Sequence, residues 1–409
     1  MDSVARPEPS VRGNDNVGVE SSEEQLAPGV GMPRRTFSDR LPRPWMFPLL
    51  VFAADWIVIL ASWQFANVHY HTTHGWWWYF WVKDSGFYAG IARHWYAGHT
   101  GPGGLLPTTL GFFPVFPALI KLISFVTGGT GTTAHTIVAG LIANVLSGAA
   151  ASLAVWALAA RVRDRWLADR TVLLFCAFPG AMTFGMMYSD PLGVALAAAS
   201  LLAVLNRRWI LAGLLAALGT AEHPTLIALI PALGVAALVA VWTRREWRTL
   251  LGAVLAPLGV IGFVAWIGTR YHDYRFWPKV ELQHWGHHID WGAHIYHTLT
   301  WSAPGMNKHP NYFALVILLV VVSVVGVALM LIARVPLVIS AFTIFVFASL
   351  ILSSSAGPLP RYLWPMLGIF IGAAATLPRW VYWPVVVVSA AALFIAVGWW
   401  PHHPLAPPP

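Results

Sequence analysis

The chain has 409 residues, of which 57% are hydrophobic and only 10% are charged. A soluble domain carries about a quarter charged residues, so this composition excludes an ordinary soluble protein. The formal charge of +8 fits arginine retained in the cytoplasmic loops of a membrane protein, and no nucleic-acid partner is expected. The single cysteine, Cys176, rules out an intrachain disulfide framework.

Residues 1–44 are polar, rich in arginine and without hydrophobic periodicity, so we expect a disordered cytoplasmic tail. No short hydrophobic segment with a cleavage site opens the sequence, so we expect no removable signal peptide. Apolar runs close to the roughly 20-residue length of a membrane span recur from Trp45 onward. They indicate one multi-span domain over residues 45–400, followed by a Pro-rich tail at 401–409. The eleven runs cover residues 45–66, 134–160, 171–188, 191–205, 209–220, 224–243, 249–268, 312–333, 335–353, 361–377 and 380–400.

Basic residues set the expected orientation of these runs. If the tail is cytoplasmic and all eleven runs cross, most of the 25 Lys and Arg residues fall in the tail and the cytoplasmic loops. This is the positive-inside pattern of a multi-pass membrane protein, and the bias towards arginine, alanine, glycine and proline favours a bacterial plasma membrane. The histidines then lie outside, as do Asp84, Asp190 and Glu222. Any chemistry is therefore expected on the extracytoplasmic side.

One apolar segment, residues 112–128, does not fit as a span. It contains Pro114, Pro117 and a central Lys121, and crossing here would turn every later arginine cluster outward. A lysine at the middle of the bilayer also costs about 2.5–3.5 kcal/mol on insertion scales. We interpret the segment as a re-entrant helix or a helix lying in the membrane surface.

The first outside loop, residues 67–133, carries an aromatic cluster from Trp76 to Trp81 and then a helical pattern. Tyr88 lies on the apolar stripe of this predicted interfacial helix, and Asp84 stands at its start. Asp84 either caps the helix, a role that aspartate favours, or acts as a general base on an acceptor hydroxyl. One residue could also do both.

Two outside turns place further polar groups on the same side. Asp190 precedes a proline, a pattern typical of a helix start, but it could equally bind substrate hydroxyls. Glu222 and His223 form a turn between two short apolar runs, which indicates either broken helices lining a cavity or a plain hairpin.

The outside loop at 270–311 is rich in histidine and tryptophan. His284 and His288, and His294 and His297, have helical ligand spacing, so metal binding, phosphate or sugar recognition, and interfacial packing all stay open. Arg361 and Tyr362 open a later span. The arginine there could hold a lipid phosphate or merely extend its charged group to the membrane surface.

Five short motifs, in order along residues 76–370, resemble those of the PIG-V-like mannosyltransferases. That family is related to the second mannosyltransferase of glycosylphosphatidylinositol assembly and belongs to the GT-C glycosyltransferase superfamily. The motifs are Asp84 to Ala92, Phe112 to Pro117, Tyr188-Ser189-Asp190, Ala221 to Leu226, and Arg361-Tyr362 with Pro365.

The resemblance implies an all-α, polytopic, GT-C-like fold with about 11 transmembrane helices, plus amphipathic or re-entrant helices in the first outside loop. It implies an inverting transfer of a sugar, mannose in the first place, from a polyprenyl-phosphate donor to a glycan, glycolipid or protein acceptor, without a metal or other cofactor. Asp84 would be the catalytic base, while Arg361, His223 and Lys121 would offset charge on the departing phosphate. The full set of implied substrate-binding residues is Tyr88, Lys121, Asp190, Glu222, His223, Arg361 and Tyr362.

This sequence departs from the family pattern at three positions, because Phe87 stands for a tryptophan, Asp190 for a glutamate and His223 for an arginine. These changes put the sugar and the acceptor in doubt. A multi-span transporter or a non-catalytic protein that binds lipid-linked sugars therefore stays as the alternative function.

Overall fold

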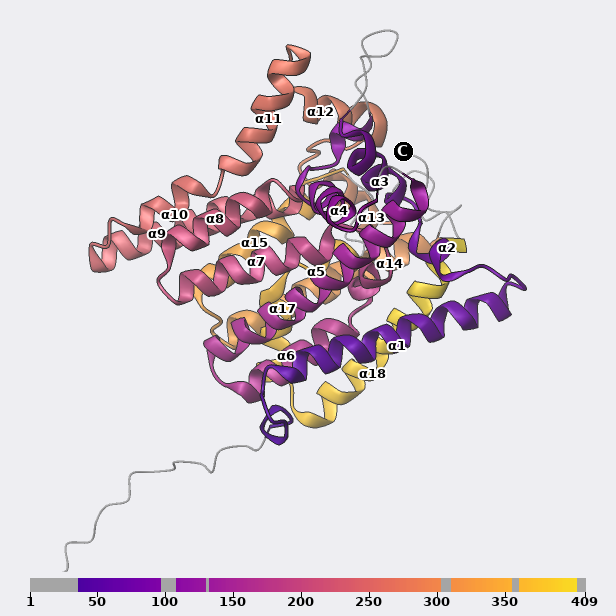
Figure 1. Cartoon of the computed structure of the whole chain (residues 1–409). Coiled ribbons are helices and arrows are strands. Elements are labelled where there is room, and N and C mark those ends of the chain that lie inside the picture. Colours follow the sequence, from indigo (N-terminus) through magenta and orange to yellow (C-terminus); the bar gives the residue numbers. More distant parts are fainter. Residues whose placement is uncertain (1–35, 97–107, 130–131, 303–309, 355–359, 403–409) are drawn as a thin grey trace, which may run out of the picture. The chain divides into compact units, whose positions relative to one another are not determined.

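The computed structural model describes residues 36–96, 108–129, 132–302, 310–354 and 360–402 (Figure 1). Over these residues the chain is helical, and its sole strand-like feature is an isolated bridge between Ile289 and Ser353. The predicted all-α class is confirmed. Residues 1–35, the Pro-rich end from 403 and parts of both long outside loops fall outside the described residues.

The elements follow one another in this order: η1 Ser38–Arg40, α1 Met46–His69, α2 Trp76–Phe80, α3 Ser85–His94, η3 Thr108–Gly111, α4 Val115–Val126, α5 Thr133–Val162, α6 Arg165–Ala177, η4 Pro179–Gly185, α7 Asp190–Leu205, α8 Trp209–Thr220, η5 Pro224–Ala228, α9 Leu229–Arg244, α10 Thr249–Leu255, α11 Leu258–Tyr271, α12 Phe276–Val280, η6 Glu281–Trp285, α13 Ala293–Leu299, α14 Pro310–Ile332, α15 Leu337–Ile351, α16 Pro360–Leu363, α17 Leu367–Thr376, α18 Arg379–Trp399 and η7 Trp400–His402.

Six apolar helical segments among the described residues are long enough to cross a membrane. A seventh candidate is the pair α6 and η4, which is bent by 72° at its break. The runs predicted at 191–205, 209–220, 335–353 and 361–377 contain the shorter apolar helices α7, α8, α15 and α17. All eleven predicted runs therefore contain helices. The number that cross stays a prediction.

The segment predicted to lie in the membrane surface forms α4, which has only 12 residues. At 1.5 Å per residue it is about 18 Å long, well short of the roughly 30 Å hydrocarbon core. Phe116, Pro117 and Ile120 are buried on one side of α4, which packs on α3 and α5. Its length agrees with a surface-lying helix, which stays our interpretation.

Small residues let the central helices approach closely. A Cβ added at Gly213 would lie 2.6 Å from the Gly252 carbonyl oxygen, so α8 and α10 touch through their backbones. Gly259 at the start of α11 lies still closer to α8, where an added Cβ would overlap the Ala217 carbonyl oxygen. Such contacts are typical of membrane helices, whose association depends on close packing because lipid is as apolar as their side chains.

The loops predicted to be cytoplasmic adjoin one another at one end of the helices. Their contacts are Arg161 Nε to Asn206 Oδ1 at 2.8 Å, Arg207 to Glu246 at 3.5 Å, and Arg170 Nη2 to the Leu377 carbonyl at 2.7 Å. The end of α5 and the loops following α7 and α9 are thus brought together, and the loop following α17 contacts α6. This grouping is what the positive-inside count requires, while the absolute orientation stays a prediction.

Residues 36–40 join this same end of the helices. The Ser38 backbone N–H donates to Asp169 Oδ2 at 2.9 Å, and Asp39 pairs with Arg165 at 3.2 Å. Ser38 is fully buried. This segment is therefore packed against α6, ahead of the predicted domain boundary at Trp45.

Candidate active site

Asp84 lies at the start of α3, where the sequence allowed either a cap or a catalytic role. It occupies the N-cap position, but its side chain makes no capping hydrogen bond. Its backbone N–H is directed at the Tyr188 hydroxyl, 3.4 Å away. The carboxylate is therefore not used by its own helix and is available for another partner.

That partner is Arg361, which is 277 residues further along the chain. Arg361 Nη1 donates to Asp84 Oδ2 at 2.9 Å, and Nη2 donates to the Tyr362 hydroxyl at 2.7 Å. The side chains of Arg361 and Asp84 are only 14% and 20% exposed. The guanidinium also lies over the rings of Tyr188 and Tyr362, with its Cζ 5.1 and 4.7 Å from their centroids. A charge pair is thus held in an aromatic, largely dry environment.

The short helix α16 is held in place by Trp364. The Trp364 indole N–H donates to the Phe175 carbonyl at 3.0 Å, and its ring stacks on the Phe175 ring with the centroids 4.6 Å apart. Because Trp364 is fully buried, it fixes α16 against α6. Arg361, three residues earlier on α16, is directed at Asp84 as a result.

Tyr88, one helical turn after Asp84, extends the site towards α7. Its hydroxyl shares a hydrogen bond of 2.8 Å with Ser189 Oγ, and burial raises the pKa of Tyr88 well above its ordinary value. Asp190 follows at the first turn of α7 and is buried, with Oδ2 lacking a hydrogen-bond partner. The cap residue of α7, Ser189, makes no side-chain capping bond either. Both polar groups are therefore oriented towards the site.

Glu222 is a buried carboxyl between α8 and η5. It lies near the Phe116 backbone and the Ser189 hydroxyl, yet neither carboxyl oxygen makes a hydrogen bond of good geometry. Burial raises the pKa of Glu222 well above its ordinary value. Burial therefore favours the protonated carboxyl, a form that is able to donate as well as accept.

His223 has a defined protonation pattern. The Thr225 backbone N–H donates to its Nδ1 at 3.2 Å, so Nδ1 carries no proton. Burial lowers the pKa of His223 below its ordinary value, although the nearby Asp190 opposes this effect. The imidazole is therefore neutral, with its proton on Nε2, and offers a hydrogen bond in place of the positive charge suggested by the sequence.

The His- and Trp-rich loop packs over the same aromatic cluster. Trp285 meets the rings of Phe87 and Phe112 at 5.9 and 6.0 Å between centroids. Glu281 accepts hydrogen bonds from Trp277 Nε1 at 3.1 Å and pairs with His287 Nδ1 at 2.9 Å. Its charge also acts on His223. This loop thus adds a further carboxylate beside the predicted site.

One histidine of each pair with ligand spacing is hydrogen-bonded to another group. His288 Nδ1 bonds the Gly286 carbonyl and Ser354, and His297 Nδ1 bonds Ser302. Across the described ranges, no three His, Cys, Asp or Glu side chains are close enough together to share a metal ion. Residues 303–309 of this predicted loop fall outside the described structure.

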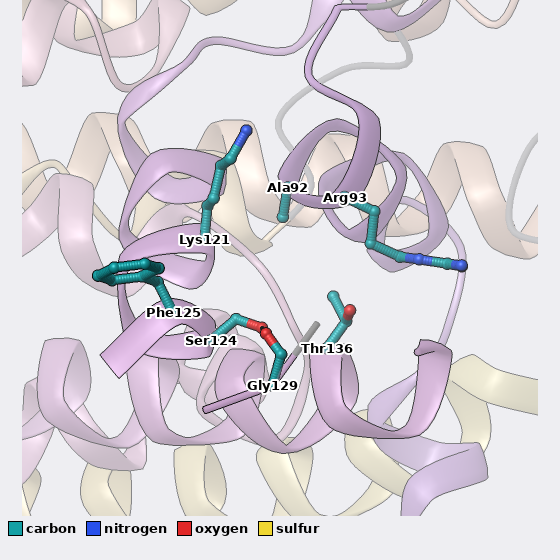
Figure 2. Close-up of a pocket in the computed structure, with 7 residues that line it drawn as sticks. All are labelled: Ala92, Arg93, Lys121, Ser124, Phe125, Gly129 and Thr136. Carbon is teal, nitrogen blue, oxygen red and sulfur yellow. Dashed lines mark hydrogen bonds between the residues drawn. The ribbon is translucent and has the colours of Figure 1, made fainter. Parts of the chain in front are cut away.

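Lys121 lies apart from the other predicted site residues. It is on the exposed side of α4, with Nζ 5.6 Å from the Trp95 ring centroid. There it lines a separate pocket with Arg93, Ser124 and Thr136 (Figure 2). The structure therefore groups Asp84, Tyr88, Asp190, Glu222, His223, Arg361 and Tyr362, and leaves Lys121 outside this group.

Three residues of the group were not predicted from the sequence. Tyr188 and Ser189 stand in the quoted Tyr-Ser-Asp motif, which could have indicated them. Glu281 lies in a loop crowded with polar residues, where no spacing distinguishes it. Together the site offers one ion-paired carboxylate, one charged guanidinium and several hydrogen-bonding groups. It is suited to deprotonating a hydroxyl and to compensating negative charge on a phosphate.

The sequence model of glycosyltransferase family 87 matches residues 114–355. A comparison with curated proteins finds no match. Among solved structures, the chain is similar to ArnT from Cupriavidus metallidurans bound to undecaprenyl phosphate. The TM-score is 0.52 at 17% identity, over 84% of this chain and 62% of ArnT.

The apo state of the same ArnT gives a TM-score of 0.50 at 15% identity, over 86% of this chain and 75% of ArnT. The archaeal oligosaccharyltransferase AglB from Archaeoglobus fulgidus, in complex with an inhibitory peptide and a dolichol-phosphate, gives 0.49 at 12% identity, over 91% of this chain and 57% of that one. The similarity to ArnT confirms the predicted GT-C-like fold.

Proposed function

The chain belongs to glycosyltransferase family 87, and we propose that it transfers a sugar from a polyprenyl-phosphate donor to an acceptor hydroxyl at the extracytoplasmic face of the membrane. The ArnT structure of similar fold holds undecaprenyl phosphate, which supports a lipid-linked donor. The acceptor is a glycan, a glycolipid or a protein.

The observation that carries this proposal is the buried Asp84–Arg361 pair. In the proposed step, the acceptor oxygen attacks the anomeric carbon of the sugar while its proton passes to the Asp84 carboxylate. The bond between that carbon and the donor phosphate oxygen breaks, and the electron pair leaves with the polyprenyl phosphate. Attack from the side opposite the phosphate inverts the anomeric centre.

The leaving phosphate gains one negative charge in this step, and Arg361 is the group that compensates it. A guanidinium presents two parallel N–H donors that match phosphate oxygens. Both are engaged in the described structure, one by Asp84 and one by Tyr362. Donor binding would therefore exchange the carboxylate for the phosphate and release Asp84 to act as a base.

The remaining polar groups suit the hydroxyls of a sugar ring. Asp190 accepts hydrogen bonds, Glu222 donates one in the protonated form that burial favours, and neutral His223 donates from Nε2. Tyr88 positions Ser189 beside these groups. This mixed set of donors and acceptors suits the hydroxyls of a carbohydrate.

Mannose is the sugar that we propose first, because the ordered motifs resemble the PIG-V-like enzymes. The replacements at Phe87, Asp190 and His223 lie in or beside the site. They are therefore the positions where another sugar or acceptor would be selected. We also propose a bacterial plasma membrane and a cytoplasmic N-terminus, on the basis of the arginine distribution.

The test uses membranes that contain the full chain and radiolabelled polyprenyl-phosphate mannose. We expect wild type to transfer label to an endogenous acceptor and Asp84→Asn to be slower by about 10²–10⁴-fold, the usual contribution of a general base. Asp273→Asn is the matched control, since Asp273 pairs with Lys279 in the loop at 270–311. Unchanged transfer by Asp84→Asn would remove Asp84 from the mechanism. A wild type that binds but transfers no lipid-linked sugar would favour a non-catalytic binding protein.

A further inference from the structure

A pocket with a cationic rim lies between α3, α4 and the start of α5. It measures about 170 Å³ and is lined by Ala92, Arg93, Lys121, Ser124, Phe125, Gly129 and Thr136 (Figure 2). Figure 2 shows Lys121 and Arg93 on either side of the space, with Ser124 and Thr136 closing it below. This pocket is separate from the Asp84–Arg361 pair.

The pocket carries positive charge that is not neutralised by the protein. Neither Arg93 nor Lys121 forms an ion pair with any residue of the described chain, and none of the seven lining residues is acidic. Arg93 Nη1 donates to Thr133 Oγ1 at 2.9 Å, which holds the side chain at the rim. Its Nε is buried without a hydrogen-bond partner. The unpaired charge of Arg93, and not this enclosed Nε, is what favours an anion from outside the protein.

The wall of the pocket continues into an apolar surface. On α4, Lys121, Leu122, Phe125 and Val126 share one face, because residues four apart lie on the same side of a helix. Leu122, Phe125 and Val126 are 57%, 81% and 73% exposed. An exposed apolar face beside a cation is the pattern of a helix in the membrane interface, where anionic headgroups meet acyl chains.

We propose that this pocket binds an anionic phospholipid, with the phosphate between Lys121 and Arg93 and an acyl chain along the exposed face of α4. The two cations match phosphate oxygens, whereas the Ser124 and Thr136 hydroxyls already donate to the Gly129 and Thr132 carbonyls. The adjoining apolar face favours a lipid over a free phosphate, since a soluble anion would leave that face uncovered.

The lipid site and the proposed reaction site lie at opposite ends of α3. The helix begins after Asp84 and contains Arg93 in its last turn. Nine residues of helix separate these side chains by about 14 Å along the axis. Lipid binding is therefore independent of Asp84 chemistry, and it can be tested whether or not the proposed transfer is correct.

The test is native mass spectrometry of the full chain in detergent with added phosphatidylglycerol or phosphatidylcholine. Wild type should retain phosphatidylglycerol preferentially, and Arg93→Gln with Lys121→Gln should weaken this retention by about tenfold or more. Arg93→Lys with Lys121→Arg keeps both charges and should retain the lipid, as should Arg270→Gln, which removes a cation from α11. Asp84→Asn should bind the lipid as wild type does.

Equal retention of phosphatidylglycerol by wild type and the double Gln variant would overturn the proposal. So would equal retention of the two lipids by wild type. Displacement of phosphatidylglycerol by inorganic phosphate at equal concentration would assign the pocket to the free anion and would also overturn it. The charge-preserving variant separates loss of the site from loss of folding, because it alters the same two positions.

Discussion

The Asp84–Arg361 pair predicts a measurable coupling between two residues 277 positions apart. The perturbation is a double-mutant cycle of Asp84→Asn, Arg361→Gln and the combination, with the free energy of unfolding as the measured quantity. Each single change leaves one partner in a largely buried place without its counterpart. The double change removes both charges together, so its cost should be smaller than the sum of the single costs.

The size of the coupling follows from the geometry. Two unit charges about 4 Å apart interact by about 4 kcal/mol at an effective dielectric constant of 20. The Nη1–Oδ2 distance is 2.9 Å and the side chains are 14% and 20% exposed, so water screens only part of this attraction. We expect a coupling of about 3 kcal/mol and a cost of about 3–5 kcal/mol for Arg361→Gln alone.

Unfolding by titration with sodium dodecyl sulfate in mixed micelles gives the four free energies. The Asp39–Arg165 pair is the matched control, because its side chains are 41% and 55% exposed at a similar distance of 3.2 Å. Its coupling should stay below about 1 kcal/mol. Single costs at Asp84 and Arg361 that add to within about 0.5 kcal/mol would refute a buried ion pair.

Three further predictions concern groups inside the protein. Burial raises the pKa of Glu222, so its contribution to stability is complete below the unfolded pKa of about 4.3 and declines as pH rises towards the folded pKa. Glu222→Gln should remove that decline from the melting temperatures recorded between pH 5 and pH 9. An unchanged dependence of melting temperature on pH would count against a protonated carboxyl. His223→Asn keeps an acceptor for the Thr225 backbone N–H but loses the Nε2 donor. Sugar transfer should therefore fall about tenfold with little change in melting temperature. Activity equal to that of wild type would exclude His223 from substrate binding. Gly259→Ala would place a Cβ in overlap with the Ala217 carbonyl oxygen and should lower the melting temperature. Gly262→Ala on the same helix has open space around its Cβ and should raise the melting temperature slightly. Similar effects of the two substitutions would contradict the described contact of α8 and α11.

The helices could be predicted because their signal is local. Each apolar run reflects the need to satisfy backbone hydrogen bonds within one segment in lipid, and the length of that segment is set by the bilayer. The grouping of Arg161, Arg207 and Arg170 loops at one end also followed from counting basic residues. The 72° bend between α6 and η4 was not predicted, although it lies where Pro179 follows an extended Phe178, a local signal for a helix end.

For the candidate site, the sequence predicted only the side of the membrane on which its residues lie. Parity placed Asp84, Arg361 and Lys121 outside, but it could not tell that the first two form a pair and that Lys121 lies at another pocket. The cap position of Asp84 was likewise correct while its capping role was wrong. The difference depends on Trp364, whose packing directs Arg361 at the carboxylate, and no sequence period records such a contact.

Because Arg361 is already bonded to Asp84, loss of the Asp84 charge should change the affinity for a lipid phosphate in a predictable direction. If Asp84 and a donor phosphate compete for the same guanidinium, removing the carboxylate charge should strengthen phosphate binding even though it slows transfer. We expect Asp84→Asn to bind undecaprenyl phosphate about tenfold more tightly than wild type, since one charge-assisted hydrogen bond no longer has to be broken first. Arg361→Gln should weaken binding, and adding Asp84→Asn to it should restore little, because no guanidinium is left to compete for. The measurement is equilibrium binding of the labelled lipid phosphate to purified variants. Weaker or unchanged binding by Asp84→Asn would mean that the carboxylate does not compete with the phosphate, and the proposed exchange of partners would fail.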